Sequence, residues 1–456
     1  MKELLFRPID IASLVFFRIA FGALAFADVL ASYIGYHLLQ DSYNVDGFRF
    51  KYYAFEWVEP FPEPFMTIFF ILMLGLALCI LVGFRYQLSA SLFAVGFTYI
   101  FLQEKAHYLN HAYLFCWLCF VMIFLPAHRA FSVDVWRKPA LYRREIPFWS
   151  MAILPGLMAI VYFYGGIAKI NPDWLQAMPL KRWLAAKSHY FLIGPILEQE
   201  FTAYFMAYGG LLLDSLVVFF LLNKRTRIWA FAAVLFFHVV NHLVFAIGIF
   251  PFLSVAITAL YFPPNFPRVL VEKLSQRFGI LRKYTQKWET RLANATPAPL
   301  WQAAPAYRTR IMAGLAVVLA IHLLLPWRHL LYPGNVAWTE EGHRYSWRMM
   351  LRSKSGSGYI EVQLPDGTKE PYKTLQLLNK RQRRKMKTHP DMILQLAHHI
   401  RDEYRANGEE VAVFARYRVR LNGKPKQFLV DPSVDLAKET WHMFEASSWI
   451  IPLAEE

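Results

Sequence analysis

Residues 149–174 read WSMAILPGLMAIVYFYGGIAKINPDW. Residues 149–168 of this stretch are uncharged and predominantly apolar. An α-helix of about 20 such residues is long enough to cross the hydrocarbon core of a bilayer. The apolar run ends at Lys169, and the following Asn171 and Pro172 are residue types at which helices commonly stop. The stretch therefore predicts a transmembrane helix with one cationic side chain at its end.

Eight further apolar segments lie on both sides of this one in the chain. Together, the nine segments span residues 11–36, 63–83, 86–103, 108–126, 149–168, 200–222, 227–246, 248–262 and 308–326. The seventh and eighth are almost contiguous and the eighth is short, so these two could form one broken segment. We therefore predict a multi-pass α-helical membrane bundle of about nine transmembrane helices.

The composition of the whole chain agrees with this prediction. Of its 456 residues, 56% are hydrophobic and 17% aromatic, and 18% are charged. An average soluble protein is about 25% charged, so the composition argues against a soluble enzyme, a fibrous repeat or a disordered protein. The net charge is +16, but the basic residues lie in short runs between apolar segments. That placement indicates membrane topology, and no binding to nucleic acid is expected.

The distribution of Lys and Arg between the connections predicts the orientation. In a nine-helix arrangement, 19 of these residues lie in the N-terminal tail and the connections on its side, and six lie in the short connections opposite. Cytoplasmic connections are enriched in Lys and Arg, so the N-terminus is predicted to be cytoplasmic. The segment after Trp327 then lies outside the cytosol, either across a bacterial inner membrane or, in a eukaryote, across the membrane of the endoplasmic reticulum.

Residues 327–456 differ in character from residues 1–326. Strands are predicted at 345–351 and 359–364 around a turn at 365–367, a second hairpin at 411–421 and 427–430 around Asn422-Gly423, and a helix at 391–406. We therefore expect a transmembrane domain at 1–326 that holds the active site, followed by a soluble exoplasmic α+β domain at 327–456. The basic run 380–387 suits either a solvated or lipid-facing stretch or a surface for an acidic polypeptide.

Lys169 is the most prominent candidate for chemistry. An ionisable side chain at the edge of the hydrocarbon region is costly and is a functional candidate by default. Desolvation would favour the neutral amine, which can act as a general base. The alternative is a structural lysine whose ammonium group extends to the membrane interface. The residues alone leave both interpretations open.

Two other apolar segments contain polar side chains. Asn110 and His111 begin the fourth segment, and His238, Asn241 and His242 lie in the seventh. His238 and His242 are four residues apart and share a helix face, which suits a metal ion, but no third ligand is evident. Hydrogen bonding within the bundle or to a polar ligand is the favoured interpretation, and no metal is expected.

Taken together, these stretches resemble the vitamin K-dependent gamma-glutamyl carboxylase family, including bacterial-type homologues with the shared HTTM membrane domain. The specific matches are the lysine motif at residues 162–174 and the segment Tyr345-Ser346-Trp347-Arg348-Met349-Met350. Less specific matches follow in the same order along the chain, at residues 110–114, 131–134, 237–241, 247–251 and 431–435. The resemblance covers nearly the whole chain.

The resemblance implies an enzyme that couples two reactions. In the family, a lysine base deprotonates reduced vitamin K, the hydroquinone of phylloquinone or menaquinone, and O2 adds to the anion. The resulting strong base removes a γ-proton from a glutamyl side chain, the quinone ends as its 2,3-epoxide, and the carbanion captures CO2 to give γ-carboxyglutamate. Lys169 matches the base, and His111 matches a histidine that would stabilise a developing oxyanion. The implied contacts to quinone or carbanion are Asn110, His238, Asn241 and Trp174.

The implied partners are a glutamate-containing polypeptide, membrane lipid and the quinone, without a metal. Two other functions stay open: a quinol-oxidising, epoxidising relative with another substrate, and a non-catalytic membrane module that binds quinone or lipid. The chain differs from the vertebrate members, which join distant segments by a cysteine pair. Here all three cysteines, Cys79, Cys116 and Cys119, lie within apolar segments.

Overall fold

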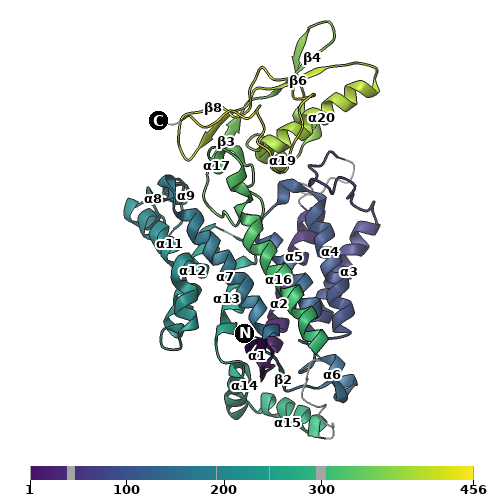
Figure 1. Ribbon diagram of the computed structural model, residues 1–456, viewed down its shortest axis with the longest axis vertical. Helices are drawn as coiled ribbons and strands as arrows, with labels where there is room; N and C mark the ends of the chain where they lie inside the picture. The colour runs from purple at the N-terminus through teal and green to yellow at the C-terminus, as the bar shows by residue number, and fades with distance from the viewer. Residues whose placement is uncertain (1, 39–46, 192, 246, 294–304, 455–456) are drawn as a thin grey trace.

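The computed structural model describes residues 2–38, 47–191, 193–245, 247–293 and 305–454. A bundle of helices runs along the long axis of the molecule, and a smaller part with strands and helices covers one end of it (Figure 1). The N-terminus lies near the opposite end, where α14 (Phe266–Arg277) and α15 (Gly279–Ala293) are found. The two ends of the bundle therefore carry different parts of the chain.

Each of the nine apolar segments forms a helix where the structure describes it. These helices are α2 (Ala12–Leu38), α3 (Phe65–Val82), α4 (Tyr86–Gln103), α5 (Asn110–Phe124), α7 (Trp149–Lys169), α11 (Glu200–Leu222), α12 (Arg227–Phe245), α13 (Phe250–Thr258) and α16 (Pro305–Leu324). In the described part of the chain, six helices are long and apolar enough to cross a membrane: α2, α3, α7, α11, α12 and α16 together with η4 (Leu325–Leu331). The helical membrane bundle is thus supported, whereas the number nine is not confirmed.

Short elements connect the long helices and lie at both ends of the bundle. They are α1 (Lys2–Phe6), β1 (Pro8–Asp10), η1 (Lys105–His107), α6 (Val133–Arg137), η2 (Pro139–Leu141), β2 (Glu145–Pro147), α8 (Pro172–Leu175), α9 (Leu180–Ala185), α10 (Gly194–Leu197) and η3 (Ala259–Tyr261). β1 and β2 pair antiparallel, so the segment before α2 is tied to the segment before α7.

Glycine and arginine residues on α2 fix how it packs. A Cβ atom at Gly22 would lie 2.6 Å from the backbone of Leu81 on α3, so glycine permits this close approach. Arg18 is buried and donates hydrogen bonds to three backbone carbonyls between α5 and α6, those of Ala127, Ala130 and Phe131. These bonds satisfy a charge inside the bundle, so Arg18 has a structural role.

The C-terminal part contains two three-stranded antiparallel sheets. One has the order β3 (Lys354–Ser357), β7 (Arg418–Leu421), β8 (Gln427–Phe428), and the other the order β5 (Lys369–Pro371), β4 (Ile360–Gln363), β6 (Ala412–Ala415). The helices are α17 (Val336–Thr339), α18 (Thr374–Leu377), α19 (Lys380–Met386) and α20 (Pro390–Ala406). The predicted strand at 359–364, the turn after it and the helix at 391–406 are confirmed.

Two predictions for this part were wrong. Residues 345–351 form no strand: Tyr345, Trp347 and Met350 have positive φ angles, and Trp347 is buried at 1% exposure against Tyr113 of the bundle. The apolar side chains of this segment are buried against the bundle, so they do not have to be buried by pairing in a sheet. The predicted strand at 411–421 is divided into β6 and β7, which belong to different sheets, so only the β7 to β8 half of that hairpin is correct.

Candidate active site

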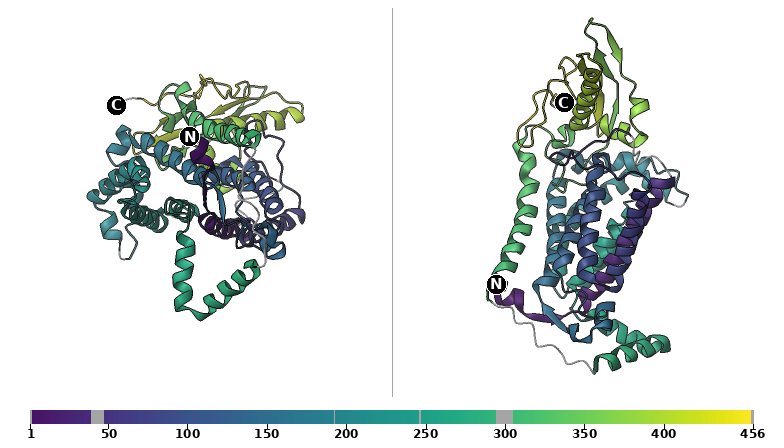
Figure 2. Two further views of the ribbon diagram at one scale, coloured as in Figure 1. Left: turned by 60° about the horizontal axis from the view of Figure 1, so that its bottom comes forward. Right: turned by 90° about the vertical axis from the view of Figure 1, so that its right-hand side faces the viewer.

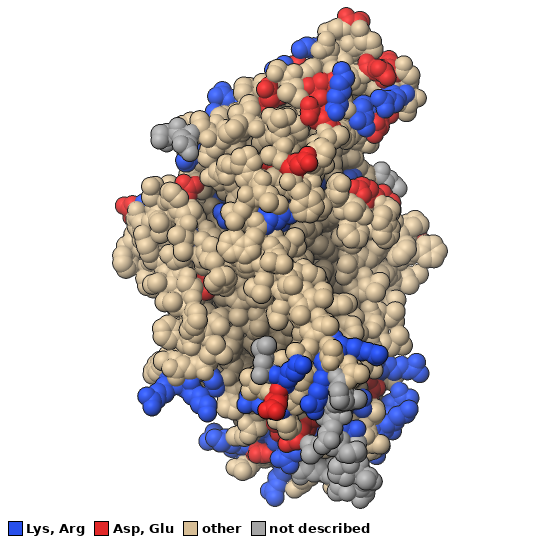
Figure 3. Space-filling model, in the orientation of Figure 1, with Lys and Arg blue, Asp and Glu red and all other residues tan. Residues whose placement is uncertain are grey.

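A cavity of about 950 Å³ lies where the bundle meets the C-terminal part. Its lining residues come mainly from α5, α7, α11 and α12, from the loop at 343–354 and from residues 384–392. Figure 3 shows a hollow below the C-terminal part with Lys and Arg side chains inside it. The structure brings all six predicted site residues to this one cavity: Asn110, His111, Lys169, Trp174, His238 and Asn241.

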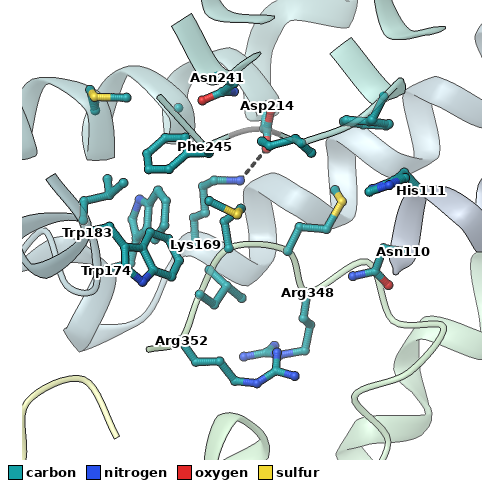
Figure 4. A pocket seen from close by; sticks show the side chains of 18 of the residues that line it. Asn110, His111, Lys169, Trp174, Trp183, Asp214, Asn241, Phe245, Arg348 and Arg352 are labelled. Atoms are coloured by element: carbon teal, nitrogen blue, oxygen red, sulfur yellow. Dashed lines mark hydrogen bonds and ion pairs between the residues drawn. The ribbon is translucent and has the colours of Figure 1, made fainter. Parts of the chain in front are cut away.

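Lys169 forms a buried ion pair with Asp214. Lys169 is the last residue of α7, and its side chain points toward Asp214 on α11 (Figure 4). The Nζ atom lies 2.5 Å from Asp214 Oδ2 and donates to the Gly165 carbonyl at 3.2 Å. Lys169 is 5% exposed and Asp214 is 6% exposed. The lysine is therefore directed into the bundle and does not extend to the interface.

Two glycines allow α11 to approach α7 at this pair. A Cβ atom at Gly165 would lie 2.8 Å from Asp214 Oδ2, and one at Gly166 would lie 2.6 Å from the Ser215 hydroxyl and 3.1 Å from its backbone nitrogen. Contacts below 3.0 Å require a neighbour to move. The Gly165-Gly166 pair of the lysine motif thus leaves the space that the carboxylate occupies.

Replacing Gly165 with alanine is expected to displace Asp214 and lower the free energy of unfolding by about 1–3 kcal/mol, the usual cost of overpacking. Gly156 lies on the same helix and has no atom within 4 Å of its ideal Cβ position, so Gly156→Ala is the matched control. Thermal unfolding in lipid nanodiscs measures both variants. Equal melting temperatures would show that the close approach at Gly165 has no energetic consequence.

Trp174 forms the cavity wall next to Lys169. Its indole nitrogen donates to the Ala207 carbonyl on α11 at 2.9 Å, and Lys169 Nζ lies 5.3 Å from the centre of its ring. Asn171 begins α8 by accepting a hydrogen bond from the Trp174 backbone at 3.0 Å. The Asn-Pro-Asp-Trp sequence therefore ends α7 at the lysine and places an aromatic ring beside the ammonium group.

The other predicted residues lie on α5 and α12. The Tyr162 hydroxyl and His238 Nε2 lie 3.0 Å apart, and His111 stacks on Phe250 with ring centres 5.8 Å apart. Asn110 accepts a hydrogen bond from the Tyr108 hydroxyl at 2.9 Å. Asn241 lines the cavity one helical turn after His238. Polar groups from two further helices thus reach the cavity that holds the ion pair.

His242 does not join this group. It is exposed, and its ring packs against Phe252 with centres 4.9 Å apart, whereas His238 is 2% exposed and lines the cavity. The two histidines therefore do not converge on one point. Within the described ranges, no three His, Cys, Asp or Glu side chains are grouped as a metal site requires.

A buried carboxylate, Glu340, binds two of the cations that line the cavity on the side of the C-terminal part. Arg352 donates two hydrogen bonds to it, both of 2.7 Å, and Lys354 donates a third of 3.1 Å. Burial alone would raise the pKa of Glu340, but Arg352 and Lys354 together hold that pKa well below its usual value. Glu340 therefore stays ionised and fixes the loop that carries Arg352.

A second buried carboxylate, Asp391 on α20, joins the C-terminal part to the bundle. It lies 2.7 Å from Arg344 and 2.6 Å from Lys105 of η1. Burial opposes ionisation, yet these two cations lower the pKa of Asp391 below its ordinary value. Since Lys105 and Arg344 also line the cavity, this network closes its upper side.

Three further cations line the cavity without an ion-pair partner among the described residues: Arg348, Lys385 and the exposed Arg384. Burial lowers the pKa of Arg348 to about 10 and that of Lys385 to about 8. Met349, which follows Arg348, lies near the Lys169 and Asp214 pair. Its Cε atom is 3.7 Å from the ideal Cβ position of Gly165. Figure 4 shows Arg348 and Arg352 side by side on the loop that faces Lys169.

Positive charge is in excess around the cavity. Eight Lys and Arg side chains line it, and the described carboxylates paired with them are Asp214, Glu340 and Asp391. Such a site attracts an anionic ligand.

Comparison with known protein families agrees with these features. The family model described as HTTM domain matches residues 6–266, and the model described as vitamin K-dependent gamma-carboxylase, lumenal domain, matches residues 307–456. The chain belongs to the vitamin K-dependent gamma-carboxylase family. It is an integral membrane protein, and no solved structure matches it.

Sequence reasoning missed two parts of this carboxylase-family site. Asp214 is the only charged residue in 201–222, so the criterion that selected Lys169 could have found it. Arg348 and Arg352 gave no such signal, because Arg348 lies within the segment 345–351 that was predicted to be a strand and Arg352 directly follows it. Only the loop conformation at 345–351 turns them toward the bundle.

Proposed function

We propose that this member of the carboxylase family carboxylates glutamyl side chains of a polypeptide and couples this to epoxidation of reduced vitamin K. The observation that carries the proposal is the buried Lys169 and Asp214 pair in a largely apolar cavity whose opposite wall is cationic. When bound, the reduced naphthoquinone supplies, with O2, the oxidation that drives removal of the γ-proton, and CO2 supplies the new carboxyl carbon.

The cavity suits a quinone with an apolar side chain. Phe201, Phe205 and Phe236 line it and are 73%, 56% and 61% exposed, so these walls on α11 and α12 also face outward from the bundle. In a membrane, that surface contacts lipid. An apolar tail would lie there, and the ring would lie beside Lys169 and Trp174, where the size of the cavity falls within the usual range for small ligands.

To act as the base, Lys169 must first lose the proton that it holds in the ion pair, and the neutral amine is then placed to take the proton of a quinol hydroxyl. Asp214 at 2.5 Å then balances the ammonium group that forms, so the transferred proton leaves no uncompensated positive charge on the bundle. This arrangement differs from the lone amine in apolar surroundings that the sequence predicted. The proposed proton acceptor is a lysine positioned by a carboxylate.

The polar groups of α5 and α12 complete the proposed site. We assign His111 to stabilising the negative charge that develops on the glutamyl side chain, because it lies on a different helix from the base. Asn110, His238 and Asn241 are assigned to hydrogen bonds with quinone oxygens. Tyr162 lies 3.0 Å from His238 and can hold the orientation of that imidazole ring.

The cationic wall supports a carboxylate-bearing substrate. Arg348 has no acidic partner among the described residues, so its guanidinium group is available to a glutamyl carboxylate. The product carries one more carboxylate than the substrate, which the excess of positive charge also accommodates. We therefore propose that the peptide enters from the side of the C-terminal part.

Arg348→Gln is expected to raise KM for a glutamate-containing peptide about 10-fold to 10²-fold, which corresponds to a lost charged hydrogen bond of about 1.5–3 kcal/mol. Epoxidation in the absence of peptide should change much less. Arg384 lines the same cavity but is exposed, so Arg384→Gln is the matched control. An unchanged KM in the Arg348 variant would contradict the assignment.

The proposed function is tested with purified protein, reduced vitamin K, labelled bicarbonate and a short glutamate-rich peptide. Epoxide and label fixed in the peptide are followed separately. We expect both products. Epoxide without fixed label would indicate a quinol-oxidising relative with another substrate, and the absence of both would indicate a non-catalytic quinone- or lipid-binding module.

The proposed orientation places the C-terminal part outside the cytosol. Figure 3 shows Lys and Arg gathered at the opposite end of the bundle, as the positive-inside rule requires for a cytoplasmic end. In a variant without native cysteines, a cysteine at Glu410 should react with an impermeant maleimide in intact cells, and one at Lys224 should react only after permeabilisation. Both positions are exposed. The reverse labelling pattern would refute the orientation and the proposed route of the peptide.

A further inference from the structure

The α14 and α15 pair forms a V that projects from the bundle at the end opposite the C-terminal part (Figure 2). No residue of α14 is buried, although Leu270 and Leu274 on it and Phe278 directly after it are large and apolar. These three side chains are 52%, 36% and 56% exposed. An apolar row of this kind needs a covering partner, because it is unfavourable in water.

The depth of α14 relative to the bundle identifies that partner as lipid. The Pro264 carbonyl just before α14 accepts hydrogen bonds from the backbone and hydroxyl of Ser13, in the first turn of α2. Phe266 packs on Phe16 of α2 with ring centres 5.7 Å apart. α2 is a candidate span from Ala12 onward, so α14 begins at the level where a span leaves the membrane.

The apolar row faces the same side as that contact. Residues 266, 270 and 274 are spaced by four, so Leu270 and Leu274 continue along the helix from Phe266. Arg268 points elsewhere and donates two hydrogen bonds to Asp10, at 3.0 and 3.1 Å. The face of α14 with Leu270 and Leu274 is thus directed toward the bilayer. The face with Arg268 is held by Asp10, which lies just before α2.

The charge of the two helices selects the kind of lipid. Residues 266–293 contain seven Lys and Arg against two Glu. α15 returns to the bundle at Trp136 of α6, whose carbonyl accepts bonds of 3.0 and 2.7 Å from Arg291. Lys287, Arg291 and Trp136 line a surface hollow there. Two cations beside an aromatic ring suit the phosphate of an anionic lipid.

We propose that α14 and α15 form an interfacial element that binds anionic lipid. The row Leu270, Leu274 and Phe278 contacts acyl chains, and Lys287 and Arg291 contact lipid phosphate. The element is anchored at Asp10 and at Trp136, and it lies in the plane of the membrane surface between these two points. It is separate from the cavity, so its test does not depend on the proposed reaction.

The contact with acyl chains is tested by fluorescence quenching on the full chain. A cysteine at Leu270 carries an environment-sensitive dye, in a background without native cysteines, in nanodiscs of phosphatidylcholine and phosphatidylglycerol with doxyl-labelled lipid. Gln276 is exposed and lies away from the apolar row, so a dye there is the matched control. We expect strong quenching at 270 and little at 276. Equal quenching at both positions would overturn the proposal. A dye at 270 that is shielded from water but not quenched by the doxyl lipid would also overturn it, and would indicate that another protein or a second copy of this chain covers the row.

The preference for anionic lipid is tested by counting retained phosphatidylglycerol by native mass spectrometry. Each cation near an anionic surface contributes about 1 kcal/mol, or about fivefold in affinity. Lys287→Gln with Arg291→Gln removes two cations and should therefore weaken the binding of phosphatidylglycerol by about 25-fold, whereas Lys224→Gln with Arg225→Gln, in the loop between α11 and α12, should not. Equal retention in both double variants would show that the hollow at Trp136 does not select the lipid.

Discussion

Lys169→Ala is expected to lower the rate of vitamin K epoxidation by about 10²-fold to 10⁴-fold, the usual contribution of a general base. The variant removes the amine that lines the cavity and pairs with Asp214. Carboxylation should fall equally, because in the proposed mechanism it depends on quinol oxidation. Epoxide formation is measured by chromatography of the quinone products under saturating reduced vitamin K.

Lys169→Arg serves as the control for charge. A guanidinium group can keep an ion pair with Asp214 but stays protonated, so it cannot accept the quinol proton. We therefore expect the arginine variant to fold better than the alanine variant and to be as inactive. Activity near the wild-type level in either variant would remove Lys169 from the reaction and leave it a structural partner of Asp214.

The helices of the bundle could be predicted because a span has a strong local signal. About 20 consecutive apolar residues are needed to satisfy the backbone inside lipid, and this requirement holds whatever the tertiary structure. The number of spans is less certain from sequence. α5 and α13 are shorter than a full span, and α4 has 18 residues but is not among the candidate spans, so only the position of these three helices in a membrane decides whether they cross it.

The C-terminal part was harder to predict because its strands are short and paired across long distances. β4 and the helix α20 carried local patterns and were found. The segment 345–351 carried a similar apolar pattern but packs against the bundle, with Trp347 buried against Tyr113 and His322. Nothing local in that segment distinguishes a strand from a loop that inserts elsewhere.

Sequence reasoning selected several residues that line the cavity, but it did not predict the ion pair between Lys169 and Asp214. Lys169, His111 and His238 were selected as polar groups in apolar segments, and the structure places all three at one cavity. The partner of Lys169 is 45 residues away on α11, and only the packing permitted by Gly165 and Gly166 brings it within 2.5 Å. Sequence reasoning therefore selected the lysine without the carboxylate that pairs with it.

The importance of that carboxylate leads to the second large expected effect. Asp214→Ala would leave the Lys169 ammonium buried without a partner, which costs about 3–5 kcal/mol when one member of a buried pair is removed. We expect a large decrease in thermal stability in nanodiscs, together with loss of epoxidation. Loss of activity alone would not separate a chemical role from unfolding.

The double variant Lys169→Ala with Asp214→Ala separates these two effects. Removing both charges together leaves no unpaired ion, so the loss of stability should be smaller than the sum for the single variants. Epoxidation should nevertheless stay absent, because the base is missing. Asp134→Asn provides a control for stability alone, since Asp134 accepts backbone hydrogen bonds from Arg85 and Tyr86 at the start of α4 and does not line the cavity. If the double variant regained both stability and activity, the pair would be a packing feature, and proton transfer would have to be assigned to another group of the cavity.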